Sequence, residues 1–89
     1  MNIYYTTQFK RDFKRLKKQR KDLDQLKVAI DKLAAGEKLE PKYRDHGLSG
    51  NWKGHRDCHI EPDWILIYRT EADELFLERT GSHSELFKK

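Results

Sequence analysis

The segment HRDCHIEPDWILIYRTEADELFLERT, residues 55–80, decides the fold of this 89-residue chain. It contains three runs of strand length, at residues 55–60, 64–69 and 74–80. Short polar turns containing Pro62 and Asp73 separate the runs, so we expect a three-stranded antiparallel meander. The middle run is apolar at five successive positions, which is typical of a central strand covered on both faces.

Upstream of this segment the sequence predicts a short strand and a helix. Residues 2–5 have strand character, and either Thr6 or Thr7 can cap the helix that follows. The apolar residues of this helix fall on one face at helical spacing: Phe9, Phe13 and Leu16. Basic residues occupy the other face.

A second helix follows, with Asp22 as its N-cap and Gly36 as its C-terminal stop. Its apolar residues also recur at helical spacing: Leu23, Leu26, Ile30 and Leu33. The two helices should form an antiparallel hairpin that covers one face of the meander. Residues 36–51 contain three glycines and a proline, so we expect a loop without helix there.

These elements predict a single domain, residues 1–89, of the α+β class. The order is β-α-α-β-β-β, and the antiparallel meander sheet packs against the helical hairpin. The single cysteine, Cys58, cannot form an internal disulfide, and its position in a strand indicates packing rather than reactivity. Trp52 and Tyr68 are also expected in the core.

Positive charge is concentrated in the first third of the chain. Residues 1–32 carry ten lysines and arginines against four aspartates, whereas residues 33–89 carry nine basic against eleven acidic residues. Eight basic residues lie close together: Lys10, Arg11, Lys14, Arg15, Lys17, Lys18, Arg20 and Lys21. This block favours a polyanion partner, with RNA or DNA preferred over an acidic protein. No second apolar stripe or signal peptide indicates a membrane partner, so we expect a cytoplasmic protein.

Three histidines and one aspartate form a candidate catalytic group. His59 ends one predicted strand, and Asp63 follows the tight turn after it. His83 follows the last strand, and His46 lies in the loop that enters the sheet. We expect the four side chains to converge at one end of the sheet. Zinc is a second use for such a set, but the spacing matches no familiar ligand pattern, so we expect no metal.

Cleavage of RNA is a chemistry that uses several histidines beside a carboxylate. A base removes the 2′-hydroxyl proton, the oxygen attacks phosphorus, and an acid protonates the leaving 5′-oxygen. A cation such as Arg79 would stabilise the transition state, and Trp64 or Phe87 could stack on an unpaired base. The sequence does not assign the base and the acid among the four groups.

Two segments resemble a known family. Residues 45–64 follow the form D-H-x-L-x-G-x-W-K-G-x-R-D-x-H-I-x-P-D-W, and residues 78–87 follow E-R-T-G-[ST]-H-x-x-L-F. Both forms are typical of the YafQ-type branch of the RelE/ParE superfamily, which the chain resembles from Asp45 to Phe87. Two further lysines, Lys88 and Lys89, follow where relatives commonly stop.

The resemblance implies the toxin of a bacterial type II toxin–antitoxin pair, a ribosome-dependent endoribonuclease that cuts mRNA in the ribosomal A site without a cofactor. By motif position, its catalytic residues are His46, His59, Asp63 and His83. Its supporting residues are Trp64, Arg79 and Phe87. His55 stands where relatives often carry an aromatic residue and is left out of the site.

The resemblance also implies partners. One is a cognate antitoxin that binds DNA and wraps the toxin, so operator DNA would be contacted only through the antitoxin complex. The others are the ribosome and mRNA. The basic helix would then contact ribosomal RNA, the antitoxin, or both.

Two other functions stay open at this point. ParE-like members of the superfamily share the fold and act on DNA gyrase without catalysis, but the histidine set is not expected in them. A plain nucleic-acid-binding module would use the basic helix, and its histidines would be incidental. The presence of all four catalytic candidates in one chain favours the nuclease.

Overall fold

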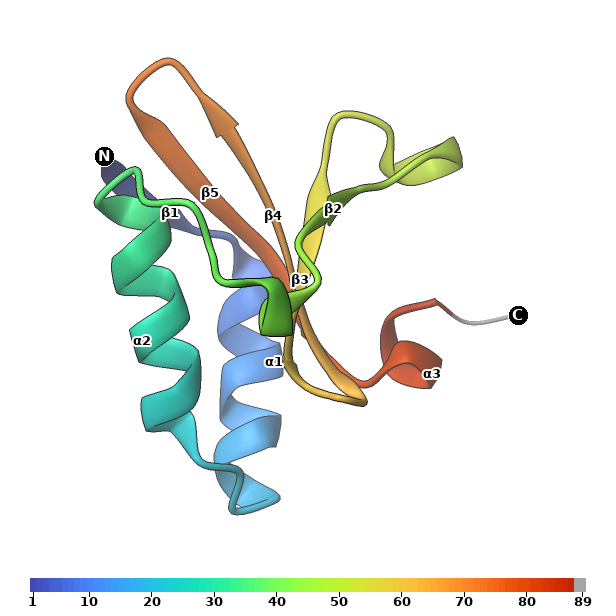
Figure 1. Cartoon of the computed structure of the whole chain (residues 1–89). Coiled ribbons are helices and arrows are strands. Elements are labelled where there is room, and N and C mark those ends of the chain that lie inside the picture. Colours follow the sequence, from blue (N-terminus) through green and yellow to red (C-terminus); the bar gives the residue numbers. More distant parts are fainter. Residues whose placement is uncertain (88–89) are drawn as a thin grey trace.

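A five-stranded mixed sheet forms the centre of the computed structural model, which describes residues 1–87. The strands are β1 (Asn2–Tyr5), β2 (His46–Gly47), β3 (Arg56–Glu61), β4 (Trp64–Glu71) and β5 (Glu74–Gly81), in the order β1-β5-β4-β3-β2. The helices are α1 (Thr7–Lys18), α2 (Leu23–Ala34) and the short α3 (His83–Leu86). The hairpin of α1 and α2 packs against the sheet, as Figure 1 shows, and the predicted α+β class is confirmed. Within residues 1–87, no helix has the length and apolar character that crossing a bilayer requires.

The strands β3, β4 and β5 form the predicted antiparallel meander. Leu66 on β4 pairs with Cys58 on β3 and with Thr80 on β5, so β4 is central. The first five residues of β4 are all buried. They alternate between two faces, with Trp64, Leu66 and Tyr68 toward the hairpin and Ile65 and Ile67 away from it.

Two short edge strands complete the sheet in a way that the sequence did not predict. β1 lies parallel to β5, with Asn2 opposite Glu74 and Tyr5 opposite Leu77. β2 has only two residues and pairs antiparallel with β3. The sheet therefore extends beyond the expected meander. A two-residue strand has no periodicity to detect, and parallel pairing depends on the path of the helices between the two strands.

The segment expected to be a loop without helix contains two 3₁₀ turns, η1 (Pro41–Tyr43) and η2 (Gly50–Trp52). The expectation was wrong here because Leu39 and Tyr43 are buried against the core, so this segment is packed down rather than looped out. Pro41 stands at the start of η1, where its missing N–H costs no hydrogen bond.

Side-chain caps begin both long helices. Thr6 Oγ1 accepts a hydrogen bond from the Phe9 N–H at 3.0 Å, which makes Thr6 the N-cap rather than Thr7. Asp22 caps α2 as expected. Phe9 is buried, but Phe13 is 37% exposed, contrary to its expected place in the core. Phe13 borders a groove between α1 and α2, at the edge of the apolar stripe, where the sheet does not cover it.

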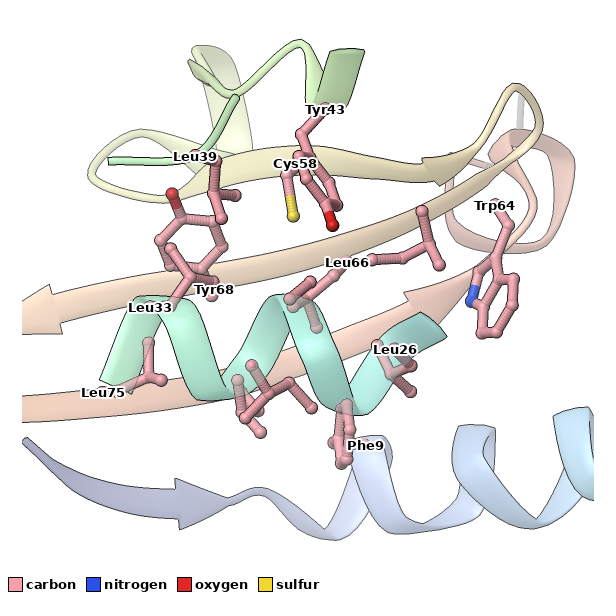
Figure 2. Packing of buried hydrophobic residues seen from close by; sticks show 14 of the residues in the cluster. Phe9, Leu26, Leu33, Leu39, Tyr43, Cys58, Trp64, Leu66, Tyr68 and Leu75 are labelled. Atoms are coloured by element: carbon pink, nitrogen blue, oxygen red, sulfur yellow. The ribbon is translucent and has the colours of Figure 1, made fainter. Parts of the chain in front are cut away.

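The main core lies between the helical hairpin and the sheet, as Figure 2 shows. Phe9 and Leu26 from the helices pack there with Leu66 and Leu75 from the sheet. Cys58 is fully buried in this core, and burial raises the pKa of its thiol to about 12. The cysteine is therefore held as a neutral thiol, in agreement with the expected packing role.

A second, smaller apolar cluster lies on the other face of β4. Its buried members are Ile65, Ile67 and Leu86, and partly buried Leu48, Trp52 and Phe87 pack against them. Tyr68 belongs to the main core as expected, but Trp52 does not. The second face is therefore only partly covered, and its cover comes from α3 and from the segment around η2.

Asp12 joins α1 to the edge of β5 beyond the end of β1. Its side chain is 2% exposed and accepts hydrogen bonds from Arg79 (2.7 and 3.1 Å), Arg15 (2.8 Å) and the Thr80 backbone N–H (3.1 Å). Burial favours the neutral acid, but these donors together outweigh burial and lower the pKa of Asp12. The carboxylate therefore takes the place of a strand partner for Thr80.

Replacing Asp12 with alanine should destabilise the fold. Removing one member of a buried ion pair leaves the other charge unpaired, so we expect a loss of about 3 kcal/mol in the free energy of unfolding at neutral pH. Because folding lowers the pKa of Asp12, its contribution is present above its unfolded value of about 3.9 and is lost as the pH falls through the folded value.

Urea unfolding at neutral and at acid pH measures this contribution. The difference in the free energy of unfolding between the wild type and Asp12→Ala should be smaller at acid pH than at neutral pH. The matched control is Asp31→Ala, which changes an exposed aspartate of α2. Equal losses at the two positions, or a difference that persists in acid, would contradict the role given to Asp12.

Candidate active site

Three histidines form a row on the face of the sheet that points away from the helical hairpin. His46 comes from β2, His59 from β3 and His83 from the first turn of α3. The ring centroids of His46 and His59 are 6.3 Å apart, and those of His59 and His83 are 5.4 Å apart. Phe87 continues the row, with its ring 6.2 Å from that of His83. The structure thus brings together residues from three separate segments of the chain, β2, β3 and α3 with its C-cap Phe87.

Strand register places the first two histidines. His46 lies opposite Asp57 in the pairing of β2 with β3, and His59 follows Asp57 by two residues, so all three point to the same face. Beyond the last strand, Ser82 caps α3 in a capping box with Glu85, and this fixes His83 at the start of the helix.

Gly81 lets α3 turn back over the sheet. A Cβ atom at this position would lie 2.5 Å from Arg15 Nη2 and 2.9 Å from Glu85 Oε1, so these two side-chain ends would have to shift to admit any other residue. Both groups belong to the ion pair of Arg15 with Glu85, whose Nε and Oε2 atoms are 3.0 Å apart. The glycine therefore leaves room for the Arg15–Glu85 ion pair, which joins α1 to α3 beside the end of β5.

Asp63 orients His83. Its Oδ1 accepts hydrogen bonds from His83 Nδ1 at 2.8 Å and from the His83 backbone N–H at 3.1 Å. The hydrogen bond from the His83 side chain, followed by that from its backbone, lowers the pKa of Asp63. An ionised carboxylate can only accept, so Nδ1 carries the hydrogen. The Nε2 atom of neutral His83 then has a free lone pair.

His46 is held in the same tautomer by a backbone carbonyl. Its Nδ1 lies 2.8 Å from the Arg44 oxygen, and a carbonyl oxygen can only accept. Arg44 has a left-handed backbone with φ of 48°, which is uncommon for a residue other than glycine. The two outer histidines of the row therefore both have Nδ1 bonded to the protein and Nε2 available to a substrate.

Trp64 does not join the site. It is 1% exposed, and its indole N–H donates to Thr80 Oγ1 at 2.9 Å inside the main core. The expectation that Trp64 stacks on a base was wrong, because the residue begins β4 on the hairpin side of the sheet. Trp52 lies on the correct face instead, with its ring edge-on to Phe87 at 6.5 Å.

Arg79 stands at the border of the site and is 24% exposed. Its Nε and Nη2 atoms donate to Asp12, so the guanidinium is fixed in place. It lines a shallow hollow together with Trp52 and Phe87. The expected cation is therefore near the aromatic end of the row, and Asp12, which the sequence did not single out, sets its position.

The basic block is exposed at six of its eight positions: Lys10, Arg11, Lys14, Lys17, Lys18 and Arg20. Arg15 was expected among them, but it is half-buried and paired with Asp12 and Glu85, so it holds the fold together. Lys21 lies 3.6 Å from Glu61 and over the ring of Trp64. The six exposed cations are called the basic surface below.

A hollow of about 520 Å³ lies between His59 and residues of α2 and η1. Its wall includes the apolar side chains of Val28 and Ile60, and Lys42 and Arg44 contribute cations. His55, left out of the site on sequence grounds, instead contacts Trp52 edge-on and lies 3.4 Å from Glu78. Within residues 1–87, no three or more histidines, cysteines or acidic residues are arranged to hold a metal ion. The metal-free site stays a prediction.

Comparison with known proteins identifies the family. The profile of a family described as the bacterial toxin of type II toxin–antitoxin systems, YafQ, matches residues 1–88. The mRNA interferase toxin YafQ of Escherichia coli strain K12 is 45% identical over 87 residues, which cover 97% of this chain and 95% of that protein. This chain belongs to the YafQ family.

Solved YafQ structures agree with the fold described above. The crystal structure of YafQ from E. coli strain BL21(DE3) matches with a TM-score of 0.94 and 44% identity, covering 97% of each chain. YafQ in the crystal structure of the E. coli DinJ-YafQ complex matches with a TM-score of 0.91 and 45% identity, also covering 97% of each chain. The RelE-like α+β fold expected from the YafQ resemblance is thereby confirmed.

Asp57 is a residue of the candidate site that sequence reasoning missed. It is 3% exposed and lies beneath the histidine row, with Oδ1 3.2 Å from His46 Nδ1. The available signal was its spacing of two residues from His59 in a strand, which puts both on one face. Because 38% of the residues in the chain are charged, a single aspartate such as Asp57 is expected to be exposed.

The hydrogen bonds of the outer histidines predict their tautomers. At mildly alkaline pH, both His46 and His83 should carry the hydrogen on Nδ1, because a carbonyl and a carboxylate accept it there. Nitrogen-15 NMR of the ring nitrogens measures this directly. In Asp63→Ala, His83 should lose its single tautomer while His46 keeps its own. A hydrogen on Nε2 of either ring in the wild type would contradict the arrangement.

Proposed function

We propose that this YafQ-family chain is the toxin of a bacterial type II toxin–antitoxin pair, an endoribonuclease that cuts mRNA in the ribosomal A site. The observation that carries the proposal is the pair of outer histidines, each with Nδ1 bonded to the protein and Nε2 free. The activity in the name of the E. coli relative, mRNA interferase, supports the same reaction. The chemistry is general acid–base catalysis without a metal.

The reaction needs two proton transfers. One histidine of the pair His46 and His83 takes the proton from a 2′-hydroxyl, whose oxygen then attacks the adjacent phosphorus. The bond from phosphorus to the 5′-oxygen breaks, and the other histidine gives its proton to that oxygen. The products are a 2′,3′-cyclic phosphate and a 5′-hydroxyl, so no water or cofactor is consumed.

The remaining groups fit around the scissile phosphate. His59 stands between the outer histidines, where an imidazolium would stabilise the added charge of the transition state. Phe87 and Trp52 offer ring faces and edges for an unstacked base at one end of the row. The hollow beside His59 has room for a neighbouring nucleotide, with Arg44 placed to contact its phosphate.

Partners follow from the family and from the charge. YafQ forms a complex with DinJ in E. coli, so we propose a cognate antitoxin for this chain, one that binds operator DNA itself and wraps the toxin. We assign the basic surface to ribosomal RNA because its cations are exposed and lie on α1 or just beyond it. A cytoplasmic location follows from action on the ribosome.

Mapping of 5′ ends on an mRNA incubated with the protein, with and without translating ribosomes, tests the function. We expect cleavage at A-site codons only when ribosomes are present, because the site has few groups to hold free RNA. Efficient site-specific cutting of naked mRNA would contradict ribosome dependence. In addition, the double variant Lys14→Glu/Lys18→Glu should flatten the dependence of ribosome affinity on salt. The control variant Lys27→Glu/Lys38→Glu has the same charge change outside the basic surface and should leave that dependence unaltered.

A sulfur substitution identifies the acid. An mRNA with sulfur in place of the bridging 5′-oxygen has a leaving group that departs without protonation, so it restores cleavage to a variant lacking the acid but not to one lacking the base. We expect His46→Ala and His83→Ala each to lose about 100-fold or more in single-turnover rate on normal mRNA. The sulfur substrate should rescue one of the two. Rescue of His59→Ala, or of neither outer variant, would overturn the assignment.

A further inference from the structure

Asp57 is a buried carboxylate that the fold alone does not explain. Its side chain is 4% exposed, and its Oδ1 receives no hydrogen bond from residues 1–87. Burial raises its pKa, which means that the ionised form is held at a cost. By contrast, Asp12 is equally buried but has strong donors on both oxygens. Hydrogen bonding within the fold therefore accounts for the buried position of Asp12 but not for that of Asp57.

The histidine row lies against this carboxylate. Asp57 Oδ1 is 3.2 Å from His46 Nδ1, although the N–H of that ring points to the Arg44 oxygen. His59 shares the face of β3 with Asp57, and its own Nδ1 is likewise buried without a hydrogen bond in the described chain. Two unsatisfied polar atoms thus lie in the same small region, directly behind the proposed catalytic groups.

The charges around Asp57 are those of the row itself. His46 from β2, His59 from β3 and His83 from α3 each favour its ionised form, and Asp45, which precedes β2, opposes it. Asp45 is already occupied, since it accepts from Arg56 Nε at 3.0 Å and from the Tyr68 hydroxyl at 2.7 Å. Among residues 1–87, no lysine or arginine forms an ion pair with Asp57. Within the part of the chain that the structure describes, the groups placed to offset a charge on Asp57 are therefore the histidine rings of the row.

We propose that Asp57 is a positioning residue that keeps one ring of the His46 and His59 pair protonated for the reaction. Neighbouring imidazoles of the row, whose centroids are 6.3 and 5.4 Å apart, repel each other when both are charged, so an unassisted row would tend toward neutrality. A buried carboxylate behind the row offsets this repulsion and localises one proton. The cleavage reaction needs such a proton, either on the acid or on the ring that faces the transition-state charge. This inference rests on the proposed function.

The isosteric variant Asp57→Asn tests the inference through the pH dependence of single-turnover cleavage. Without the carboxylate, the imidazolium should lose its proton at a lower pH. The alkaline limb of the pH–rate profile should therefore shift by about one unit toward lower pH. The rate at neutral pH should fall by about 10-fold. The melting temperature should stay the same or rise, because a costly buried charge has been removed. Asp73→Asn, in the turn between β4 and β5, is the matched control and should leave the profile in place.

An alkaline limb that does not move in Asp57→Asn overturns the inference, whether or not the rate or the stability falls, since a purely structural role lowers the rate without shifting its pH dependence. A second measurement needs no variant. Nitrogen-15 NMR of the wild-type protein at neutral pH should show one imidazolium at His46 or His59, and two neutral rings would also overturn the inference. The NMR result does not depend on cleavage, whereas failure of the wild-type protein to cut mRNA on ribosomes would instead refute the proposed function.

Discussion

The carboxylate of Asp12 holds together parts of the chain that are distant in sequence. It receives hydrogen bonds from Arg79 and Thr80 on the last strand and from Arg15 one helical turn away. Arg15 in turn pairs with Glu85, which caps α3. These contacts connect one buried charge on α1 to the end of β5 and, through Arg15, to the first turn of α3. The position of His83 follows from the start of α3.

The central strand divides the molecule into two electrostatic environments. On the hairpin side, Leu66 and its neighbours are dry, and the only titratable group of the core on β3 is a thiol held neutral. On the other side, Ile65 and Ile67 are buried, but some of the side chains that cover them are partly exposed, and the imidazoles gather beside this cluster. Ionisable groups can keep their charge on the second face because water reaches it. The apolar cluster of Ile65 and Ile67, together with Asp57, influences which of these groups are charged.

Much of the fold could be predicted from the sequence because its signals are local. The apolar run of β4, the turn at Pro62 and the caps at Thr6 and Asp22 each act within a few residues. The grouping of His59, Asp63 and His83 also followed, since they lie at or near the ends of adjacent strands.

What could not be predicted depended on long-range contacts. Asp12 and Arg15 lie in a run of charged residues that resembles a solvated helix face, and only contacts with β5 and α3 show that they are structural. The face on which Trp64 lies depends on strand register. A short run that is apolar at both odd and even positions does not determine that register. The parallel pairing of β1 with β5 spans almost the whole described chain, so no local pattern could reveal it.

That same pairing gives the molecule an order of assembly. β1 is made first during translation, but the strand that it pairs with, β5, is the last of the sheet to be made, and α3 with His83 follows it. A nascent chain that stops in the turn before β5 has no neighbour for β1. Its Asp12 lacks Arg79 and Thr80, and only His46 and His59 of the three histidines in the row have been made. The candidate site is therefore incomplete until β5 and α3 have left the ribosome, which delays its chemistry on the particle that it is proposed to attack.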